Sequence, residues 1–145
     1  MTDKGYTTEE LIENFLNTTI ASGAADEFIL AAQKFIDEET GRNFKADEEA
    51  SERLYSGDGT QELIIDDCVE VTKVEVGADF YGDSKNEVQE MVPGTNADGY
   101  ILFPANRNDG DDQVIPIRKL GLRERLWVYG VQNHQITAKW GYSEE

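Results

Sequence analysis

Apolar and polar positions recur with a helical period in the first forty residues of the chain. Thr7 and Glu10 have the spacing of a capping box, and four apolar residues behind them share one helical face: Leu11, Ile12, Phe15 and Leu16. After a break that contains Gly23, a second helix is predicted over residues 25–40, with Gly41 as its left-handed cap. Its apolar stripe comprises Phe28, Ala31, Ala32, Phe35 and Ile36. The pattern predicts a short helical hairpin.

The period changes to that of β-strands from Arg53 onward. The stretches RLY and QELIID flank the sequence SGDGT (residues 56–60), whose glycines permit the positive φ angles of a tight β-turn. Residues 69–76 alternate between apolar and polar, but the alternation changes phase. This change predicts a β-bulge near Thr72 and Lys73, or burial on both faces of the strand.

The second half of the chain carries five further strand patterns. They lie near residues 88–92 and at YILFP (100–104), VIPI (114–117), LWVYG (126–130) and QITAKWGY (135–142). Pro116 cannot donate a hydrogen bond to a neighbouring strand, so VIPI is predicted to be an edge strand. Aromatic residues alternate along the last two predicted strands and are interpreted either as packing on a sheet face or as anchors for a partner: Trp127, Tyr129, Trp140 and Tyr142.

Helices followed by strands make the predicted fold α+β, with an N-terminal helical hairpin followed by an antiparallel β-rich half. The length of 145 residues predicts a single domain (1–145), mainly helical over 1–50 and mainly β over 51–145. No apolar run approaches the ~18 residues of a membrane span, and the polar, acidic N-terminus is unlike a signal peptide. The lone cysteine, Cys68, rules out a disulfide framework and fits a reducing compartment.

Charge is distributed unevenly along the chain. The formal net charge is −17, and residues 1–100 hold 24 acidic and 7 basic side chains, whereas residues 101–145 hold 6 of each. An acidic surface repels a phosphate backbone, so ordinary nucleic-acid binding is disfavoured over most of the chain. The acidity therefore indicates either simple solubility or a surface that must lie near DNA without gripping it.

Four basic residues gather within eight positions around Gly121: Arg118, Lys119, Arg123 and Arg125. They are interpreted either as a solvated turn between strands or as a basic patch. Such a patch would meet the acidic first half of another copy, or an acidic partner, and would set the orientation of the contact. The candidate interaction residues are these four together with two C-terminal aromatic residues, Trp140 and Tyr142.

No constellation of catalytic or metal-binding residues is visible. His134 is the only histidine and is predicted to lie at the surface in a turn. Cys68 has no second cysteine to pair with, and its acidic neighbours would raise the pKa of its thiol. The sequence NDGDD (residues 108–112) fails the ligand spacing of an EF-hand, and Gly57-x-Gly59 lacks the third glycine of a nucleotide fingerprint. We therefore expect no enzyme activity, no cofactor and no metal.

The order of these segments resembles the head–tail connector (adaptor, or head-completion) proteins of tailed bacteriophages. The likeness begins at YTTEELIENFL and continues through the alanine-rich second helix with its Thr-Gly-Arg-x-Phe end. It then covers RLYSGDGTQELIIDDCVEVTKVEV, YILFP and ITAKWGY, so it includes most of the chain, although each motif is short and structural. Many relatives continue beyond Trp-Gly-Tyr into a Pro-led C-terminal helix, whereas this chain stops at Glu145.

The resemblance implies an architectural function. Such proteins form a ring, usually of twelve copies, that docks on the portal protein, extends the DNA channel and receives the next neck or tail-completion protein. Packaged DNA would pass through this channel without specific binding, and no membrane is implied. The implied location is the head–tail neck of the virion, and the host cytoplasm before assembly. The acidic first hundred residues and the basic segment 118–125 would supply the two different patches that a closed ring needs.

Two other classes of protein stay open on the sequence alone. An acidic DNA mimic that inhibits a nucleic-acid enzyme also suits the small size and the charge, but it needs carboxylates spaced like phosphates on one continuous face. A small enzyme or metal-binding module has no supporting constellation. A pull-down from host lysate would identify the first class, and a metal-dependent shift of the melting temperature would identify the second.

Overall fold

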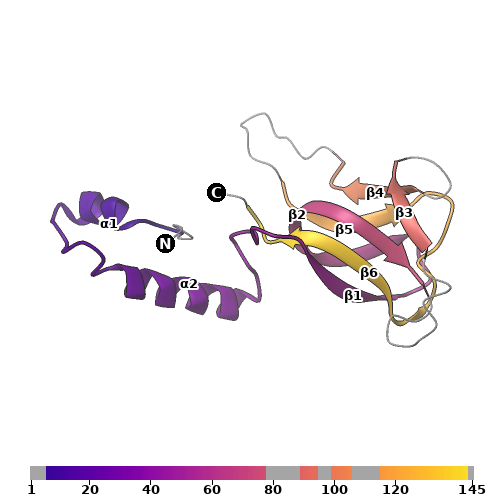
Figure 1. Cartoon of the computed structure of the whole chain (residues 1–145), viewed down its shortest axis with the longest axis horizontal. Helices are drawn as coiled ribbons and strands as arrows, with labels where there is room; N and C mark the ends of the chain where they lie inside the picture. Colours follow the sequence, from indigo (N-terminus) through magenta and orange to yellow (C-terminus); the bar gives the residue numbers. More distant parts are fainter. Residues whose placement is uncertain (1–5, 78–88, 95–98, 106–114, 144–145) are drawn as a thin grey trace. The chain divides into compact units, whose positions relative to one another are not determined.

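The computed structural model describes residues 6–77, 89–94, 99–105 and 115–143. The chain divides into two compact units, Met1–Lys45 and Ala46–Glu145, which we name the helical unit and the β unit (Figure 1). The boundary falls close to residue 50, where the sequence predicts the change from a mainly helical to a mainly β part. The expectation that both parts form a single domain stays a prediction.

The helical unit contains two helices. Helix α1 (Glu9–Leu16) begins after Thr8, whose side-chain oxygen accepts a hydrogen bond at 3.3 Å from the backbone N–H three residues on. The sequence pattern predicts the cap at Thr7, so the observed cap lies one residue later. Helix α2 (Asp26–Thr40) ends at Gly41, whose φ of 63° is the predicted left-handed conformation. The two helices are confirmed, whereas their pairing as a hairpin stays a prediction.

Polar contacts near the helix ends hold the helical unit together. The Glu9 carboxylate accepts a hydrogen bond at 3.0 Å from the backbone N–H of Gly23 in the loop between the helices. Before α1, the Tyr6 hydroxyl donates to the Asp37 carboxylate and accepts at 3.1 Å from the backbone N–H of Phe44. Burial and the bond to Asp37 raise the pKa of Tyr6 to about 12. No helix in the described part of the chain is long and apolar enough to cross a membrane.

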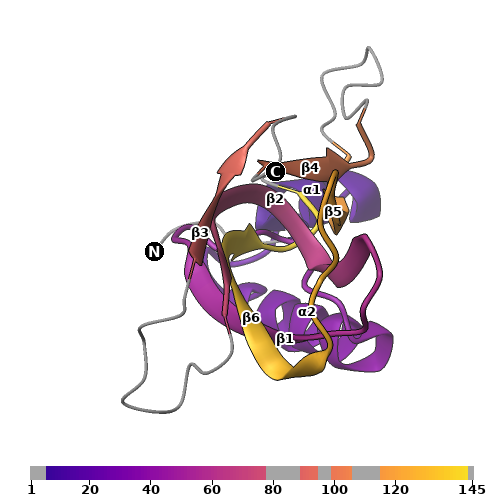
Figure 2. The same cartoon turned by 90° about the vertical axis from the view of Figure 1, so that its right-hand side faces the viewer.

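Six strands form the β unit: β1 (Ser51–Gly57), β2 (Glu62–Val76), β3 (Gln89–Pro93), β4 (Gly99–Phe103), β5 (Ile117–Leu122) and β6 (Gly130–Trp140). They lie in one sheet in the order β1-β6-β2-β3-β4-β5. Strand β2 also pairs with β5, so β2, β3, β4 and β5 close into a small barrel, and β6 and β1 extend the sheet from β2 (Figure 2). Strands β3 and β4 confirm those expected near 88–92 and 100–104, although residue 88 lies outside the described residues.

Strand β2 connects the barrel to the rest of the sheet because it changes partners along its length. Its first part pairs with β5, and its second part pairs with β6 and β3. The register against β6 shifts between Val71 and Lys73, which confirms the predicted bulge. Thr72 is the extra residue in this shift, and its hydroxyl donates to the Thr137 carbonyl on β6 at 3.1 Å.

The hairpin predicted around SGDGT does not form. Strands β1 and β2 both neighbour β6, which lies between them, so residues 56–60 connect two strands that do not pair. Gly59 has the positive φ of such a turn, at 81°. Gly57 instead allows a close approach between β1 and the connection before β6, because a Cβ there would lie 1.9 Å from the backbone oxygen of Val128. The glycines thus predict the turn correctly, but they cannot predict that the distant strand β6 lies between β1 and β2.

Three further expectations for the second half are wrong. Residues 115–117 of VIPI do not form an edge strand, because β5 begins only at Ile117, after the buried Pro116, and pairs with both β4 and β2; Val114 lies outside the described residues. Residues 126–129 form a connection rather than a strand, and β6 begins at Gly130. The sheet is not wholly antiparallel, because β3 and β4 pair in parallel.

The hydrophobic core lies in the β unit. Its largest fully buried apolar side chains come from β5, β6, β2 and the connection before β6: Trp127, Trp140, Ile117, Leu120, Ile136 and Val74. In the helical unit, by contrast, only Ala25 and Gln33 are buried among the described residues. The β unit therefore has a complete core of its own, whereas the helices leave their apolar residues in contact with water.

Candidate assembly surfaces

The apolar face of helix α2 is uncovered. Its stripe consists of the five residues that the sequence places on one face, Phe28, Ala31, Ala32, Phe35 and Ile36, and we name it the α2 stripe. The Phe28 side chain is 78 % exposed and that of Phe35 is 63 % exposed. On α1, Leu11, Phe15 and Leu16 are exposed as well. Contiguous apolar patches on a soluble surface are typical of interaction sites.

A second exposed apolar surface lies on the β unit, in the connection between β5 and β6 and at the start of β6. It consists of four side chains, which we name the apolar tip: Leu126, Val128, Tyr129 and Val131. Tyr129 is 83 % exposed and Val131 is 84 % exposed. The sequence assigned this stretch to a strand, and strand alternation would have turned half of these residues inward. Because residues 126–129 are not a strand, Leu126, Val128 and Tyr129 are all exposed, and Val131 is exposed at the start of β6.

The apolar tip is held on a rigid base. Between its exposed residues, Trp127 is fully buried and packs edge-on against the His134 ring, with the ring centroids 5.1 Å apart. The Trp127 backbone is bonded in both directions to the β1–β2 turn: its N–H donates to the Thr60 carbonyl at 2.7 Å, and its carbonyl accepts from Gly59 at 2.8 Å. The tip therefore keeps one backbone conformation without contributing its own apolar side chains to the core.

Two polar residues of β6 fix the backbone of the tip at Val128. The Asn133 side chain donates to the Val128 carbonyl at 2.8 Å and accepts from the Gly57 backbone N–H at 3.0 Å. His134 Nε2 lies 3.1 Å from the same carbonyl and donates to it. His134 is buried, so the surface position predicted for it is wrong, and burial lowers its pKa. Sequence reasoning missed this site because β1, the tip and β6 meet only in three dimensions.

Two of the candidate basic residues are engaged within the β unit. Arg118 lies on β5, pairs with the Asp67 carboxylate at 3.0 Å and lies over the Tyr142 ring at 5.7 Å from its centroid. Lys119, also on β5, pairs with Glu62 on β2 at 2.8 Å. Gly121 is part of the same strand, so the interpretation as a turn between strands is wrong for Arg118 and Lys119, whereas residues 123–125 do lie in the connection after β5. These two cations neutralise carboxylates of their own sheet.

The other two basic candidates precede the apolar tip directly. Arg123 and Arg125 follow β5 and are both exposed. The Gln61 side chain donates to the Arg123 carbonyl at 3.1 Å, and the Arg125 guanidinium donates to the Gln89 side chain at 2.8 Å. These bonds hold both residues directly before the apolar tip.

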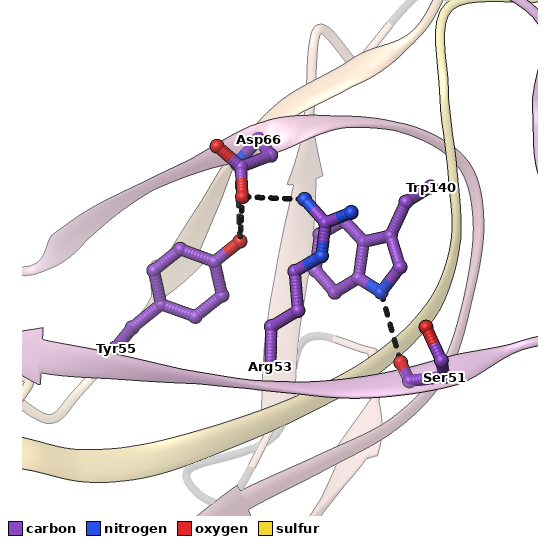
Figure 3. Close-up of polar contacts among 5 residues, drawn as sticks. All are labelled: Ser51, Arg53, Tyr55, Asp66 and Trp140. Atoms are coloured by element: carbon purple, nitrogen blue, oxygen red, sulfur yellow. Dashed lines mark hydrogen bonds and ion pairs between the residues drawn. The ribbon is translucent and has the colours of Figure 1, made fainter. Parts of the chain in front are cut away.

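Trp140 belongs to a cluster that joins β1, β6 and β2 (Figure 3). Its side chain is buried, and Nε1 donates to the Ser51 carbonyl at 2.9 Å. The Arg53 guanidinium lies 4.5 Å from the centre of the indole ring and donates to the Asp66 carboxylate at 2.7 Å. Asp66 also accepts from the Tyr55 hydroxyl at 2.9 Å, and burial raises the pKa of Tyr55. Trp140 therefore packs inside the sheet, which is the first of its two interpretations, and its indole is not available to anchor a partner.

The described residues contain no group of three or more His, Cys, Asp and Glu that could hold a metal ion. Residues 108–112, the sequence NDGDD, lie outside the described residues. Cys68 is a buried free thiol in the core of the β unit. The exposed apolar side chains of the described residues are of the kind that binds another macromolecule.

No protein-family model matches the chain, and no curated protein or solved structure shows significant similarity to it.

Proposed function

We propose that this protein is a structural subunit of the neck of a tailed bacteriophage. In this function, copies of the chain form a ring that docks on the portal, extends the DNA channel and receives the next neck or tail protein. The order of the sequence motifs supports the proposal, and so does a fold in which two helices precede a β unit. Cofactors and catalytic residues have no part in it.

The observation that carries the proposal is the uncovered apolar surface of the helical unit. A fifteen-residue helix is marginal in water when it lacks tertiary packing. The α2 stripe nevertheless exposes its two phenylalanines, and no core lies beneath either helix among the described residues. Assembly would remove these residues from water, as an obligate oligomer does with its apolar interface. A protein that acted alone would gain nothing from such a surface.

The ion pairs of the β unit weigh against the alternative of an acidic DNA mimic. A mimic needs a continuous row of unneutralised carboxylates. In the β unit, five carboxylates are paired with basic side chains: Asp66 with Arg53, Asp67 with Arg118, Glu62 with Lys119, Glu75 with Lys73, and Glu70 with Lys139. This interleaving of opposite charges breaks up any phosphate-like row on these strands.

Mass measurement by light scattering, with negative-stain imaging, tests the proposal on a mixture of this protein and the portal protein encoded by the same genome. The expected result is a ring of added density on the portal, whose mass fixes the number of copies. Absence of association at both low and moderate salt would overturn docking on the portal. Arg123→Glu with Arg125→Glu is expected to weaken assembly more at low salt than at high salt, because exposed charges are screened by ions.

A further inference from the structure

We propose that the α2 stripe binds a basic amphipathic helix of a different protein, which presents apolar side chains to the stripe and Lys or Arg residues to its acidic end. The inference deepens the proposed function and rests on it for the origin of this helix, which belongs to the portal protein. Recognition of this kind, in which the apolar face of one helix lies against an apolar surface of another protein, is a common mode of binding.

The stripe is not the face through which α2 packs in its own unit. From the residue before α2 to the end of the helix, the positions that are buried or half-buried are spaced four residues apart and share another face: Ala25, Ile29, Gln33 and Asp37. The contacts within the helical unit therefore cover this second face. They leave the stripe open to a partner.

Large and small side chains alternate along the stripe. Phe28 and Phe35 are about two helical turns apart, and Ala31 and Ala32 lie between them. All four side chains are exposed. Small residues between large ones allow a partner's side chains to approach the helix backbone closely. The stripe is thus suited to a large aliphatic side chain of a partner helix, inserted between its two rings.

The C-terminal end of the stripe is acidic. Glu39 continues the line of Phe28, Ala32 and Phe35 along one side of α2 and is exposed. In the described part of the chain, no hydrogen bond or ion pair joins Glu39 to another residue. The last turn of α2 contains no basic residue, although the C-terminus of a helix favours a cation. A Lys or Arg of the partner would supply this cation.

The other charges of α2 do not change the sign of this end. Lys34 is the only basic residue of the helix, and it lies 3.8 Å from the Glu38 carboxylate. Asp37 accepts a hydrogen bond from the Tyr6 hydroxyl. At the other end of α2, Glu27 is exposed and has no basic partner among the residues that the structure describes. With five acidic side chains and one basic one, α2 attracts a basic partner.

The same charges disfavour a second copy as the occupant of the stripe. Residues 1–45 hold nine acidic and four basic side chains, and residues 46–145 hold 21 acidic and nine basic ones. The formal charges are therefore −5 and −12, so both units of a second copy carry the wrong sign. Charge complementarity selects a basic segment of another protein, and contacts between copies in the ring use other surfaces.

Binding of a synthetic peptide to the full-length chain tests this chemistry. The Lys peptide is a helix of about 18 residues made of Leu, Ala and Lys, with Leu on one face, and the Glu peptide carries Glu in place of Lys. The stripe variant carries Phe28→Gln and Phe35→Gln, at positions that are more than half exposed, so it is expected to fold. Ile64→Gln is the matched control, because Ile64 is 78 % exposed on β2. Isothermal titration calorimetry measures the affinities.

The Lys peptide is expected to bind the unmodified chain and the Ile64→Gln control equally. It is expected to bind the stripe variant at least ~10-fold more weakly, because two aromatic anchors are lost. The Glu peptide is expected not to bind. Equal binding of the Lys peptide to the stripe variant and the control would show that it follows the general acidity of the chain, and this result would overturn the proposal. Absence of binding to the unmodified chain would overturn it as well.

Glu39→Lys tests the acidic end of the stripe. It is expected to weaken binding of the Lys peptide ~3-fold at low salt and by less at high salt, because exposed charges are screened by ions. Glu49→Lys is the control, since it makes the same change of charge at an exposed residue of the β unit. Equal effects of the two variants would assign the attraction to net charge alone and would contradict the named contact at Glu39.

Sedimentation of the chain without peptide examines a second copy as the occupant. The stripe variant and the unmodified chain are expected to show the same degree of self-association at each protein concentration. If the stripe variant is monomeric where the unmodified chain is not, a second copy covers the stripe and the proposal fails.

Portal binding separates this inference from the proposed function. With p-benzoylphenylalanine in place of Phe35, illumination of the complex is expected to cross-link the stripe to a portal segment that contains apolar residues and Lys or Arg. If the Lys peptide binds through the stripe but the unmodified chain does not bind the portal, the docking surface stands and the connector function fails. If the stripe variant binds the portal as tightly as the unmodified chain, the connector function stands and the named surface fails.

Discussion

The two units of the chain use their large apolar side chains in opposite ways. In the β unit, Ile136, Trp127 and Trp140 are completely or almost completely buried, whereas in the helical unit Phe28 and Phe35 face water. Burial of such a side chain contributes about 1.5–3 kcal/mol to stability, and the β unit gains this contribution within one copy of the chain. The exposed phenylalanines of the helical unit contribute no such stabilisation. The β unit thus has the core that independent folding requires, whereas the helical unit would gain such burial only through the association proposed above.

Truncation of an apolar side chain in each unit gives the sharpest test of this comparison. Ile136→Ala is expected to lower the free energy of unfolding of the β unit by about 3 kcal/mol, because the side chain is fully buried. Phe28→Ala at low protein concentration is expected to change it by less than about 0.5 kcal/mol, because the ring is already exposed. Urea unfolding followed by tryptophan fluorescence reports the β unit, which contains both Trp127 and Trp140.

An equally large loss of stability in Phe28→Ala would contradict the comparison. It would mean that the α2 stripe packs on another part of the same chain. Far-UV circular dichroism, which reports helix content, follows the helices in the same samples. The helical signal is expected to respond to the Lys peptide more strongly than the fluorescence does.

The next largest effect is expected at the base of the apolar tip. Gly57→Ala would place a Cβ 1.9 Å from the Val128 backbone oxygen and 2.5 Å from His134 Nε2. Such overpacking typically costs about 1–3 kcal/mol, and the upper end is expected here because the obstacle is backbone. Gly59→Ala is the control: its Cβ meets no atom within 4 Å, and only its φ of 81° opposes the change, at about 1 kcal/mol.

Thermal unfolding of the two glycine variants measures this difference. Gly57→Ala is expected to lower the melting temperature more than Gly59→Ala does, because its Cβ meets the Val128 backbone. If Gly57→Ala left stability unchanged, the close approach between β1 and the tip would be wrong.

A smaller effect is expected from the polar contacts of the helical unit. Tyr6→Phe removes the hydroxyl that donates to Asp37 and accepts from the Phe44 N–H. Loss of a hydrogen-bonded hydroxyl costs about 1 kcal/mol. Faster hydrogen exchange of the amides at the end of α2 is the expected result, with unchanged tryptophan fluorescence from the β unit. Equal exchange in both proteins would show that Tyr6 does not hold this end of the helix.

The parts of the fold that depend on local signals were predictable from the sequence. Gly41 ends α2 because a left-handed residue is needed there, and the phase change near Thr72 marks a bulge because strand alternation has a period of two. Both signals act within a few residues of chain. The helix boundaries and the bulge were therefore predicted closely, with the N-terminal cap displaced by one residue from Thr7 to Thr8.

The parts that depend on distant segments were not predictable in this way. The pattern of residues 126–130 predicts a strand, yet Trp127 is buried in a connection whose backbone is bonded to the β1–β2 turn, about seventy residues earlier in the chain. His134 is predicted at the surface and Trp140 is left open between sheet packing and a partner anchor, because only their neighbours in sequence are visible to such reasoning. Among the candidate contact residues, Arg123 and Arg125 alone border the apolar tip, and the tip itself was hidden inside a strand pattern that does not form.

The smallest expected effect is the pH dependence that His134 gives to the β unit. Burial lowers its pKa below the ordinary value of 6.5, and its Nδ1 atom is buried without a hydrogen-bond partner. The neutral ring donates to Val128 through Nε2, and protonation would leave a charged N–H with no acceptor at Nδ1. Folding therefore favours the neutral form, and the unfolded chain binds the proton more readily.

The stability that follows from this preference is complete above pH 6.5 and is lost as the pH falls from 6.5 through the pKa of the folded protein. Because His134 is the only histidine, the NMR signal of its ring reports the folded-state pKa without ambiguity. His134→Gln keeps a donor for the Val128 carbonyl and is expected to flatten the dependence of unfolding free energy on pH between 5 and 6.5, a range in which ordinary carboxyl groups contribute little. A folded-state pKa at or above 6.5 would contradict the buried, neutral His134 and, with it, the rigid base that the apolar tip requires.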